Sequence, residues 1–257
     1  MRVFLYLAIM EISKSEIKTI NALNKSHGRK KHQAFIVEGV KMVDELLMSN
    51  LNIIFIAGTE TWANEHLHIS NQNNFRLITN NQLQKLSNFS SSNQVIAVSK
   101  TPVPDQLHIE ANDLVLVLDT IQDPGNMGTI IRTAEWFGIS KIICSIETVD
   151  AYSSKVVQSS MGSLFRTKIY YHNLVELLQQ YSNSHKIYGS LLSGANIYSL
   201  NLEKSGFIII GNESKGISKE IQKLITQALY IPHHPTSKAE SLNAAVACSI
   251  LLSEFSK

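Results

Sequence analysis

Hydrophobic and polar positions in the first part of the chain form short apolar runs separated by helix-spaced stripes. Residues 12–25 place apolar side chains at near-helical spacing, with Ser13 and Ser15 as candidate caps. The pattern predicts helices at 12–25 and 40–49 and strands at 34–39, 52–58, 75–79 and 94–99. Residues 87–93 are polar and predict a loop. We therefore expect a small α/β domain here.

After a segment with two prolines and no periodicity, residues 100–112, the pattern becomes a regular strand–helix alternation. Strands are expected at 114–119, 141–145, 188–192, 207–211 and 229–232, and helices at 127–137, 151–161, 218–227 and 241–255. Apolar strands that alternate with helices favour a parallel sheet covered on both faces. Such sheets bind ligands at the carboxyl ends of their strands. We place the domains at 1–105 and 106–257.

Composition supports two globular domains. The chain has 257 residues, of which 44% are hydrophobic and 17% charged, and this composition excludes collagen-like, low-complexity and disordered classes. The net charge is only +2, and the positive excess lies in residues 1–105. Two distant cysteines, Cys144 and Cys248, supply neither a disulfide framework nor a cysteine zinc site, and favour a reducing cytoplasm.

The apolar run at residues 3–10 is too short to span a bilayer, so we expect no membrane anchor. Met10 precedes a helical pattern, which suggests that residues 1–9 are an upstream extension of the reading frame.

Several common motifs are missing from the sequence. No two glycines are spaced by two, which excludes the dinucleotide fingerprint and the glycine loop of common nucleotide-fold methyltransferases. Gly211 and Gly216 have the outer spacing of a phosphate loop, but the Lys and Ser/Thr that must follow are missing. GxSxG and HExxH do not occur. The adjacent His233 and His234 are expected to point in different directions, so we predict no metal site.

The first segment with candidate chemistry is residues 118–138, LDTIQDPGNMGTIIRTAEWFG. A strand ends at Asp119, Asn126 stands where a helix begins, and Gly128 allows close backbone approach. Arg132 is about 200° around the helix from the buried Ile130, so it points away from the core. A helix-capping Asn126 and a solvated Arg132 are the alternative interpretation.

The second segment is FIIIGNESKGIS, residues 207–218. Gly211 ends a buried strand and lets a flat ligand approach the backbone, and Glu213 lies in the turn that follows. Glu213 as a first-turn acid favoured by the helix dipole is equally consistent with the pattern.

The third segment, residues 230–255, begins YIPHHPTSKAESLN and leads into a helix with small residues. Small side chains let this helix press on a neighbour. Ser241 as its N-cap is the simplest interpretation and is compatible with a functional role.

Together the segments NMGTIIRTA, GNESKG and IPHHPTSKAESLN resemble the SpoU family of RNA methyltransferases, whose motifs are NxGxxxRTA, GNExxG and IPxx…ESLN in this order. The likeness covers residues 113–257. The N-terminal part resembles, more loosely, the substrate-binding domain that often precedes this catalytic domain. One departure is the longer, glycine-free loop HHPTSKA, which has His233 in place of Met.

The resemblance implies an α/β fold in which a trefoil-knotted parallel-sheet catalytic domain follows a small α/β substrate-binding domain. It further implies a homodimer, S-adenosyl-L-methionine (AdoMet) as methyl donor, and a ribose 2′-hydroxyl of structured RNA, tRNA or rRNA, as acceptor. By matching positions, it implies the active-site residues Asn126, Arg132, Glu213, Ser241 and Asn243. It implies that backbone at Gly211, Ile231 and Leu242, with Leu191, holds the cofactor.

Basic residues crowd the segment between the first helix and first strand. Because the site is expected to act on RNA, we predict that this loop binds phosphate, although such a run is often merely solvated. The predicted RNA-binding residues are Lys25, Arg29, Lys30, Lys31 and, from the catalytic domain, Arg166. Two alternatives remain, a non-catalytic RNA-binding protein of the same fold and a small-molecule α/β enzyme. The complete set of five polar motif residues disfavours the first, and the basic loop disfavours the second.

Overall fold

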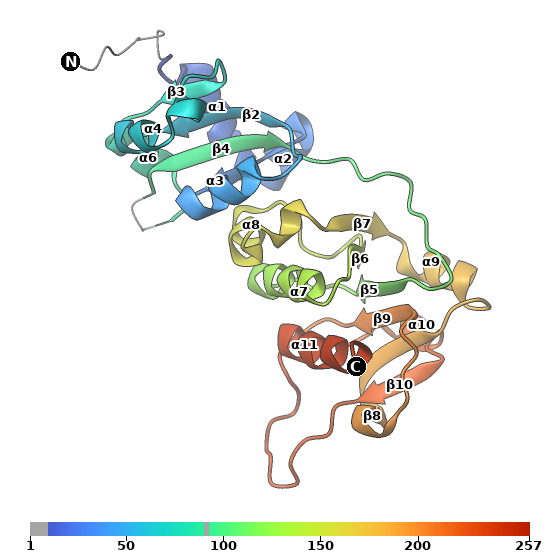
Figure 1. The fold of residues 1–257 in the computed structure, drawn as a ribbon. Helices are drawn as coiled ribbons and strands as arrows, with labels where there is room; N and C mark the ends of the chain where they lie inside the picture. Colours follow the sequence, from blue (N-terminus) through green and yellow to red (C-terminus); the bar gives the residue numbers. More distant parts are fainter. Residues whose placement is uncertain (1–9, 90–92) are drawn as a thin grey trace. The chain divides into compact units, whose positions relative to one another are not determined.

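The computed structural model describes residues 10–89 and 93–257 (Figure 1). Residues 1–9, the suggested upstream extension, lie outside the described residues, as do 90–92 of the predicted loop at 87–93. The chain divides into two compact units. The first runs to Val103 and includes Tyr152–Gln158, and the second comprises Pro104–Ala151 and Ser159–Lys257.

The first unit is a four-stranded mixed sheet with helices around it (Figure 1). Its strands are β1 (Ala34–Glu38), β2 (Ile53–Gly58), β3 (Phe75–Leu77) and β4 (Val95–Lys100). Its helices are α1 (Lys14–Leu23), α2 (Ser26–His32), α3 (Val40–Leu47), α4 (Glu60–Glu65), α5 (Leu67–Ser70) and α6 (Asn80–Leu86). In the order β1-β4-β2-β3, β4 is antiparallel to both of its neighbours, and β2 and β3 are parallel.

The basic segment of this unit is a helix, and not the loop that we predicted. Gly28 permits the close approach of α2 to α1, because a Cβ at this position would lie 1.9 Å from the carbonyl oxygen of Ala22. The Arg29 Nη1 atom donates to the carbonyl of Leu23 at 2.9 Å. These contacts, which join α2 to α1, stabilise the helix. The sequence of α2 is polar throughout and has no apolar residues at helical spacing, so its pattern did not predict a helix.

The second unit contains a six-stranded parallel sheet in the order β10-β8-β9-β5-β6-β7 (Figure 1). Its strands are β5 (Leu114–Leu118), β6 (Lys141–Ser145), β7 (Lys168–His172), β8 (Ile187–Asn196), β9 (Gly206–Ile210) and β10 (Gln227–Tyr230). Its helices are α7 (Pro124–Trp136), α9 (Leu174–Tyr181), α10 (Lys219–Gln222) and α11 (Ala244–Phe255), with short helices η1 (Ser163–Phe165) and η2 (Ile197–Ser199). Helix α8 (Ser154–Ser160) spans the division between the units.

Helices cover both faces of the parallel sheet, which confirms the prediction. Helices α9 and α10 join one core with alternate residues of β5, β6 and β9, such as Val117 and Ile209. On the other face α11 packs on β9 and against α7, and the Phe255 ring contacts Tyr188 of β8 at 4.8 Å between centroids. The fully buried strands explain the continuous apolar runs in the sequence.

Several helix boundaries differ from the predictions, and three of these differences concern a predicted cap or more than half of a helix. Helix α7 begins at Pro124 with Asp123 as its N-cap, so Asn126 is not the capping residue. Helix α11 begins at Ala244 with Asn243 as its N-cap, so Ser241 is not the cap. Helix α10 covers only Lys219–Gln222 of the predicted 218–227. None of the helices in the described parts of the chain is both long and apolar enough to cross a membrane.

Candidate active site

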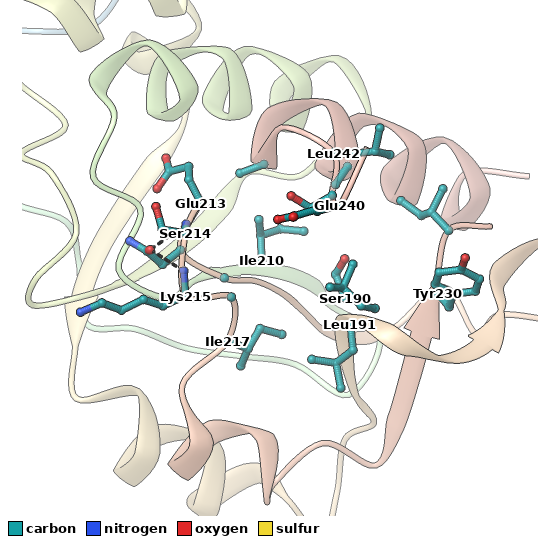
Figure 2. Close-up of a pocket in the computed structure, with 18 of the residues that line it drawn as sticks. Ser190, Leu191, Ile210, Glu213, Ser214, Lys215, Ile217, Tyr230, Glu240 and Leu242 are labelled. Atoms are coloured by element: carbon teal, nitrogen blue, oxygen red, sulfur yellow. Dashed lines mark hydrogen bonds between the residues drawn. The ribbon is translucent and has the colours of Figure 1, made fainter. Parts of the chain in front are cut away.

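A cavity of about 520 Å³ opens at the carboxyl ends of β8, β9 and β10 (Figure 2). This is the edge of a parallel sheet where ligands bind, and its volume is in the range of small-molecule sites. All four residues predicted to hold the cofactor line this cavity, namely Leu191, Gly211, Ile231 and Leu242. Two of the predicted catalytic residues, Glu213 and Ser241, line it as well.

A chain of hydrogen bonds joins three of the predicted catalytic side chains. Asn243 Nδ2 donates to Asn126 Oδ1 at 2.9 Å, and Asn126 Nδ2 donates to Glu213 Oε1 at 2.9 Å. A carboxylate accepts hydrogen bonds, so Asn126 turns its amide nitrogen toward Glu213 and its oxygen toward Asn243. Asn243 uses its own oxygen to cap α11, accepting from Ala245 N at 2.9 Å. These contacts therefore fix the orientation of both side-chain amides, those of Asn126 and Asn243.

The carboxylate of Glu213 also accepts from backbone. The amides of Gln122 and Asp123 lie at 3.5 and 3.4 Å from its oxygens. Glu213 thus ties the turn after β9 to the start of α7, which is a different role from a first-turn acid of the next helix.

Two residues outside the predicted set hold the same pair of loops together. The buried Asp119, at the end of β5, accepts from Ser218 N at 2.7 Å, and Asn212 Nδ2 donates to the Thr120 carbonyl at 2.7 Å. Thr120 has a φ of +60°, an uncommon conformation for a β-branched residue. The sequence marked Asp119 only as a strand end, and its function as a loop tie depends on a partner far along the chain.

Gly211 is required by its own turn. A Cβ at this position would lie 2.3 Å from both Gly216 C and Ile217 N. The missing side chain was predicted to make room for a ligand, but the space that a Cβ would occupy is filled by backbone of the turn itself. Gly128 allows the predicted close approach, since a Cβ there would lie 2.0 Å from Ser159 Oγ.

Arg132 and Ser241 do not join the hydrogen-bonded chain. Both side chains are exposed, and neither side chain has a hydrogen bond or ion pair with residues 10–89 or 93–257. Arg132 lies on the outward side of α7, as its spacing from Ile130 predicts, on the same helix as Trp136, which is 84% exposed. Both polar groups are therefore available to a substrate.

A family model described as the SpoU rRNA Methylase family matches residues 113–253. The chain belongs to the SpoU rRNA methylase family. A second model, the MRM3-like substrate binding domain, matches residues 14–97. Residues 113–253, the SpoU region, contain both the cavity and the hydrogen bonds that join Asn243, Asn126 and Glu213.

Relatives of this SpoU family member match nearly the whole chain. The Bacillus subtilis 23S rRNA (guanosine(2553)-2′-O)-methyltransferase RlmP is 31% identical, with 92% of this chain and 94% of the relative covered. A TrmH-family structure from Porphyromonas gingivalis superposes with a TM-score of 0.83 at 32% identity and covers 95% of this chain and 98% of its own.

An AdoMet-bound rRNA methyltransferase from Sinorhizobium meliloti has a TM-score of 0.84 at 24% identity, with 96% of each chain covered, and at this identity it shows the fold. These comparisons confirm the predicted family, the α/β fold with an N-terminal substrate-binding domain, and the class of enzyme.

The predicted RNA-binding residues of this SpoU family member fall into two groups. Lys25, Lys30 and Lys31 are exposed at the start and along the outer side of α2. Arg29 is only 7% exposed and donates to the Leu23 carbonyl, so its guanidinium supports the junction of α1 and α2. Little of the Arg29 guanidinium is therefore left to contact a phosphate.

Arg166 is exposed but engaged. It forms an ion pair with Glu135 of α7, and its Nη2 donates to Glu135 Oε2 at 3.3 Å. The Arg166 guanidinium holds the pKa of the Glu135 carboxyl below its ordinary value. An RNA phosphate would have to share this guanidinium with Glu135.

The two cysteines of the SpoU region are buried and free. Burial raises the pKa of the Cys248 thiol to about 12 and raises that of Cys144 as well, so neither is a nucleophile at neutral pH. Within the described ranges, no three His, Cys, Asp or Glu side chains come together as a metal site.

Proposed function

We propose that this chain transfers a methyl group from AdoMet to a ribose 2′-hydroxyl of RNA. The observation that carries the proposal is the hydrogen-bonded chain Asn243–Asn126–Glu213, which lies beside a small-molecule cavity and leaves Arg132 and Ser241 unpaired among the described residues. A protein that only binds RNA needs neither such a cavity nor fixed amides beside it. This favours an enzyme over a non-catalytic RNA-binding protein.

The cavity suits an adenosyl ligand in size and chemistry. Its walls combine apolar side chains, including Leu191, Ile210 and Ile217, with backbone at the ends of three parallel strands. Ligand sites of this kind bury a flat apolar group and orient it with a few polar contacts. Backbone at Gly211, Ile231 and Leu242, with Leu191, would hold AdoMet, which supplies a methyl group already activated on a sulfonium.

The remaining task of the protein is to position the acceptor oxygen. An arginine is protonated at any physiological pH and does not serve as a base. We assign Arg132 to the phosphate and the 2′-oxygen of the target nucleotide, where its forked donors match both groups. The proton of the hydroxyl then leaves to phosphate or water. Ser241 and Asn243 orient Arg132 or the ribose, and Asn126 and Glu213 stiffen that arrangement.

RNA is also held outside the cavity. The exposed lysines of α2, Lys25, Lys30 and Lys31, supply positive charge to phosphates, and Arg166 adds a contact from the SpoU region. The substrate is structured RNA, tRNA or rRNA. The Bacillus subtilis relative is named for a 23S rRNA nucleotide, so rRNA is the first substrate to test.

Three further properties belong to the proposal. The enzyme is a homodimer, and this is supported by the exposed apolar side chains of Trp136 on α7 and Val246 on α11, helices that pack against each other. The chain of the SpoU unit is threaded as a trefoil knot. The protein works in the cytoplasm.

The decisive test incubates the purified protein with tritium-labelled AdoMet and total RNA from a strain that lacks the gene. Label in RNA, followed by mapping of 2′-O-methyl positions against the parent strain, identifies the nucleotide. Calorimetric binding of AdoMet without label transfer to any RNA would instead reject the transferase and leave a cofactor-binding protein. The mass of the protein in solution, measured by analytical ultracentrifugation, tests whether it is a homodimer.

A further inference from the structure

Glu240 places a carboxylate in the wall of the cavity. Figure 2 shows its side chain among the cavity-lining residues Ile210 and Leu242. Glu240 is exposed, and within residues 10–89 and 93–257 it has no hydrogen bond or ion pair. The other carboxylate in the lining, Glu213, already accepts from Asn126 Nδ2. Glu240 is thus the cavity carboxylate that has no donor in the described chain.

A ligand that fills the cavity covers this carboxylate. Burial of a charge without a partner is costly, so the part of the ligand that covers Glu240 must bring a positive charge or strong donors. The other titratable groups of the lining are Lys215, Tyr230 and His233. The Nδ1 atom of His233 lies 3.0 Å from the carbonyl oxygen of its neighbour His234. No contact in the described chain directs any of these three groups at Glu240.

AdoMet has two cationic groups, the ammonium of its amino-acid part and the sulfonium, whereas the product S-adenosylhomocysteine retains only the ammonium. Glu240 directly precedes Ser241 in the chain, and Asn243 begins the hydrogen-bonded chain to Asn126. Under the proposed function these polar groups orient the acceptor oxygen, so the methyl-bearing sulfur lies on this side of the cavity.

We propose that Glu240 is the counter-charge of the sulfonium and makes the cavity prefer AdoMet to S-adenosylhomocysteine. The inference rests on the proposed function. It assigns to Glu240 a role in specificity, because a cavity that prefers AdoMet releases S-adenosylhomocysteine after the reaction and binds AdoMet in its place.

The charge has a defined kinetic consequence. The sulfonium loses its charge as the methyl group leaves, so a fixed carboxylate stabilises bound donor more than the transition state. Removal of the carboxylate is therefore expected to raise KM for AdoMet without lowering kcat.

The test measures AdoMet and S-adenosylhomocysteine affinities by calorimetry for wild type and Glu240→Gln. We expect AdoMet to bind about ten-fold more weakly to the variant, which is about 1.4 kcal/mol and lies between the energy of an ion pair in bulk water and that of one near a protein surface. S-adenosylhomocysteine should change by less than about two-fold, since only the charge-dependent interaction is removed. Glu240→Asp keeps the charge and should recover most of the AdoMet affinity.

Glu220→Gln is the matched control. Glu220 is an exposed acid in the first turn of α10 and does not line the cavity, so its neutralisation reports any general effect of net charge. The melting temperature of each variant checks the fold.

Equal weakening of both ligands by Glu240→Gln would assign Glu240 to the ammonium or to loop structure and overturn the inference. Unchanged AdoMet affinity, or a fall in kcat at saturating AdoMet, would overturn it as well. If wild type bound neither ligand, the proposed function itself would fail, an outcome distinct from the other three.

Discussion

The strand-end site and helix α2 use polar residues in opposite ways. At the strand ends, Asn126 lies 87 residues from Glu213 and 117 residues from Asn243 in the sequence. Hydrogen bonds between these side chains nevertheless fix how each one is oriented. On α2, Lys30 and Lys31 are exposed and project separately into solvent, while Arg29 folds inward onto the Leu23 carbonyl. The first arrangement is cooperative, and the second is a set of independent charges.

This difference predicts two kinds of mutational response. Loss of one member of a connected network disturbs the others, so effects are large and non-additive. Loss of one exposed charge removes only the contribution of that charge to RNA affinity.

The largest effect is expected for Arg132→Ala. Arg132 has no partner among residues 10–89 and 93–257, so its removal leaves the fold intact and deprives the acceptor of its clamp. We expect methyl transfer to fall by about 10²–10³-fold or more, the range for loss of a charge-stabilising donor. AdoMet affinity, measured by calorimetry, should stay within a few-fold of wild type. Wild-type kcat in the variant would exclude Arg132 from the reaction.

Gly211→Val is expected to act through the turn. A Cβ would lie 2.3 Å from the backbone of Gly216, so the turn that contains Glu213 must move. We expect AdoMet binding to weaken by more than about ten-fold and stability to fall by about 1–3 kcal/mol. Both are measurable by calorimetry and thermal denaturation.

Gly138→Ala is the control for this variant. Gly138 has a φ of +77°, which strains any residue that replaces glycine, but a Cβ there meets nothing within 4 Å. It should lose stability while keeping AdoMet affinity. If Gly211→Val bound AdoMet normally, the cavity at β9 would not be the cofactor site.

Asn243→Ala separates capping from catalysis. Asn243 caps α11, and Asn173 caps α9 with the same pattern, its Oδ1 accepting from Val175 N and Glu176 N. Each substitution to Ala should lower stability by about 1 kcal/mol. Only Asn243→Ala removes the donor to Asn126, so only this variant should lower kcat, by about ten-fold for one connected hydrogen bond. Equal kcat in the two variants would make Asn243 a cap and nothing more.

The same contrast explains what the sequence could predict. The strands β5 and β9 are buried on both faces, so their apolar runs were visible in the sequence, and the motif residues follow them directly. Strand β7 and helix α9 were missed for different reasons. Lys168, His172 and the tyrosines of β7 weaken its apolar run, whereas α9 places Leu174, Leu177 and Leu178 on one face, a helical signal that was present in the sequence. The helical state of α2 depends on packing at Gly28, which no local pattern reports.

For the site, the motifs indicated which residues matter but not what each one contacts. Asp119 and Asn212 were outside the predicted set, because their partners, Ser218 N and the Thr120 carbonyl, are backbone groups in distant loops. Asp123, three residues before Asn126, is the cap of α7, and its position before a proline was a usable signal that we did not apply. The inward turn of Arg29 had no local signal.

The smallest effect per residue is expected on α2. If Lys25, Lys30 and Lys31 contact phosphates, their joint replacement by Ala should raise the RNA KM and flatten the salt dependence of RNA affinity. Each lost contact removes about 0.7 to 0.9 units of slope in log K against log salt, so three contacts remove between about two and three units. AdoMet affinity should not change. Arg29 is left in place, because its loss would weaken the α1–α2 junction and confuse the result.

Two comparison variants make this test decisive. The triple variant of Lys14, Lys18 and Lys85 to Ala removes the same charge from exposed positions on α1 and α6 and should leave the slope near wild type. Arg29→Ala should lower stability by about 1–3 kcal/mol, the cost of a lost buried charged hydrogen bond, while changing the slope little. If the salt dependence of RNA affinity were flattened in both triple-lysine variants, RNA would be attracted by the net charge of the protein and not by contacts on α2. Parallel salt lines for wild type and the α2 triple would mean that the first unit does not hold RNA through this helix, because a phosphate contact cannot be lost without releasing fewer counterions.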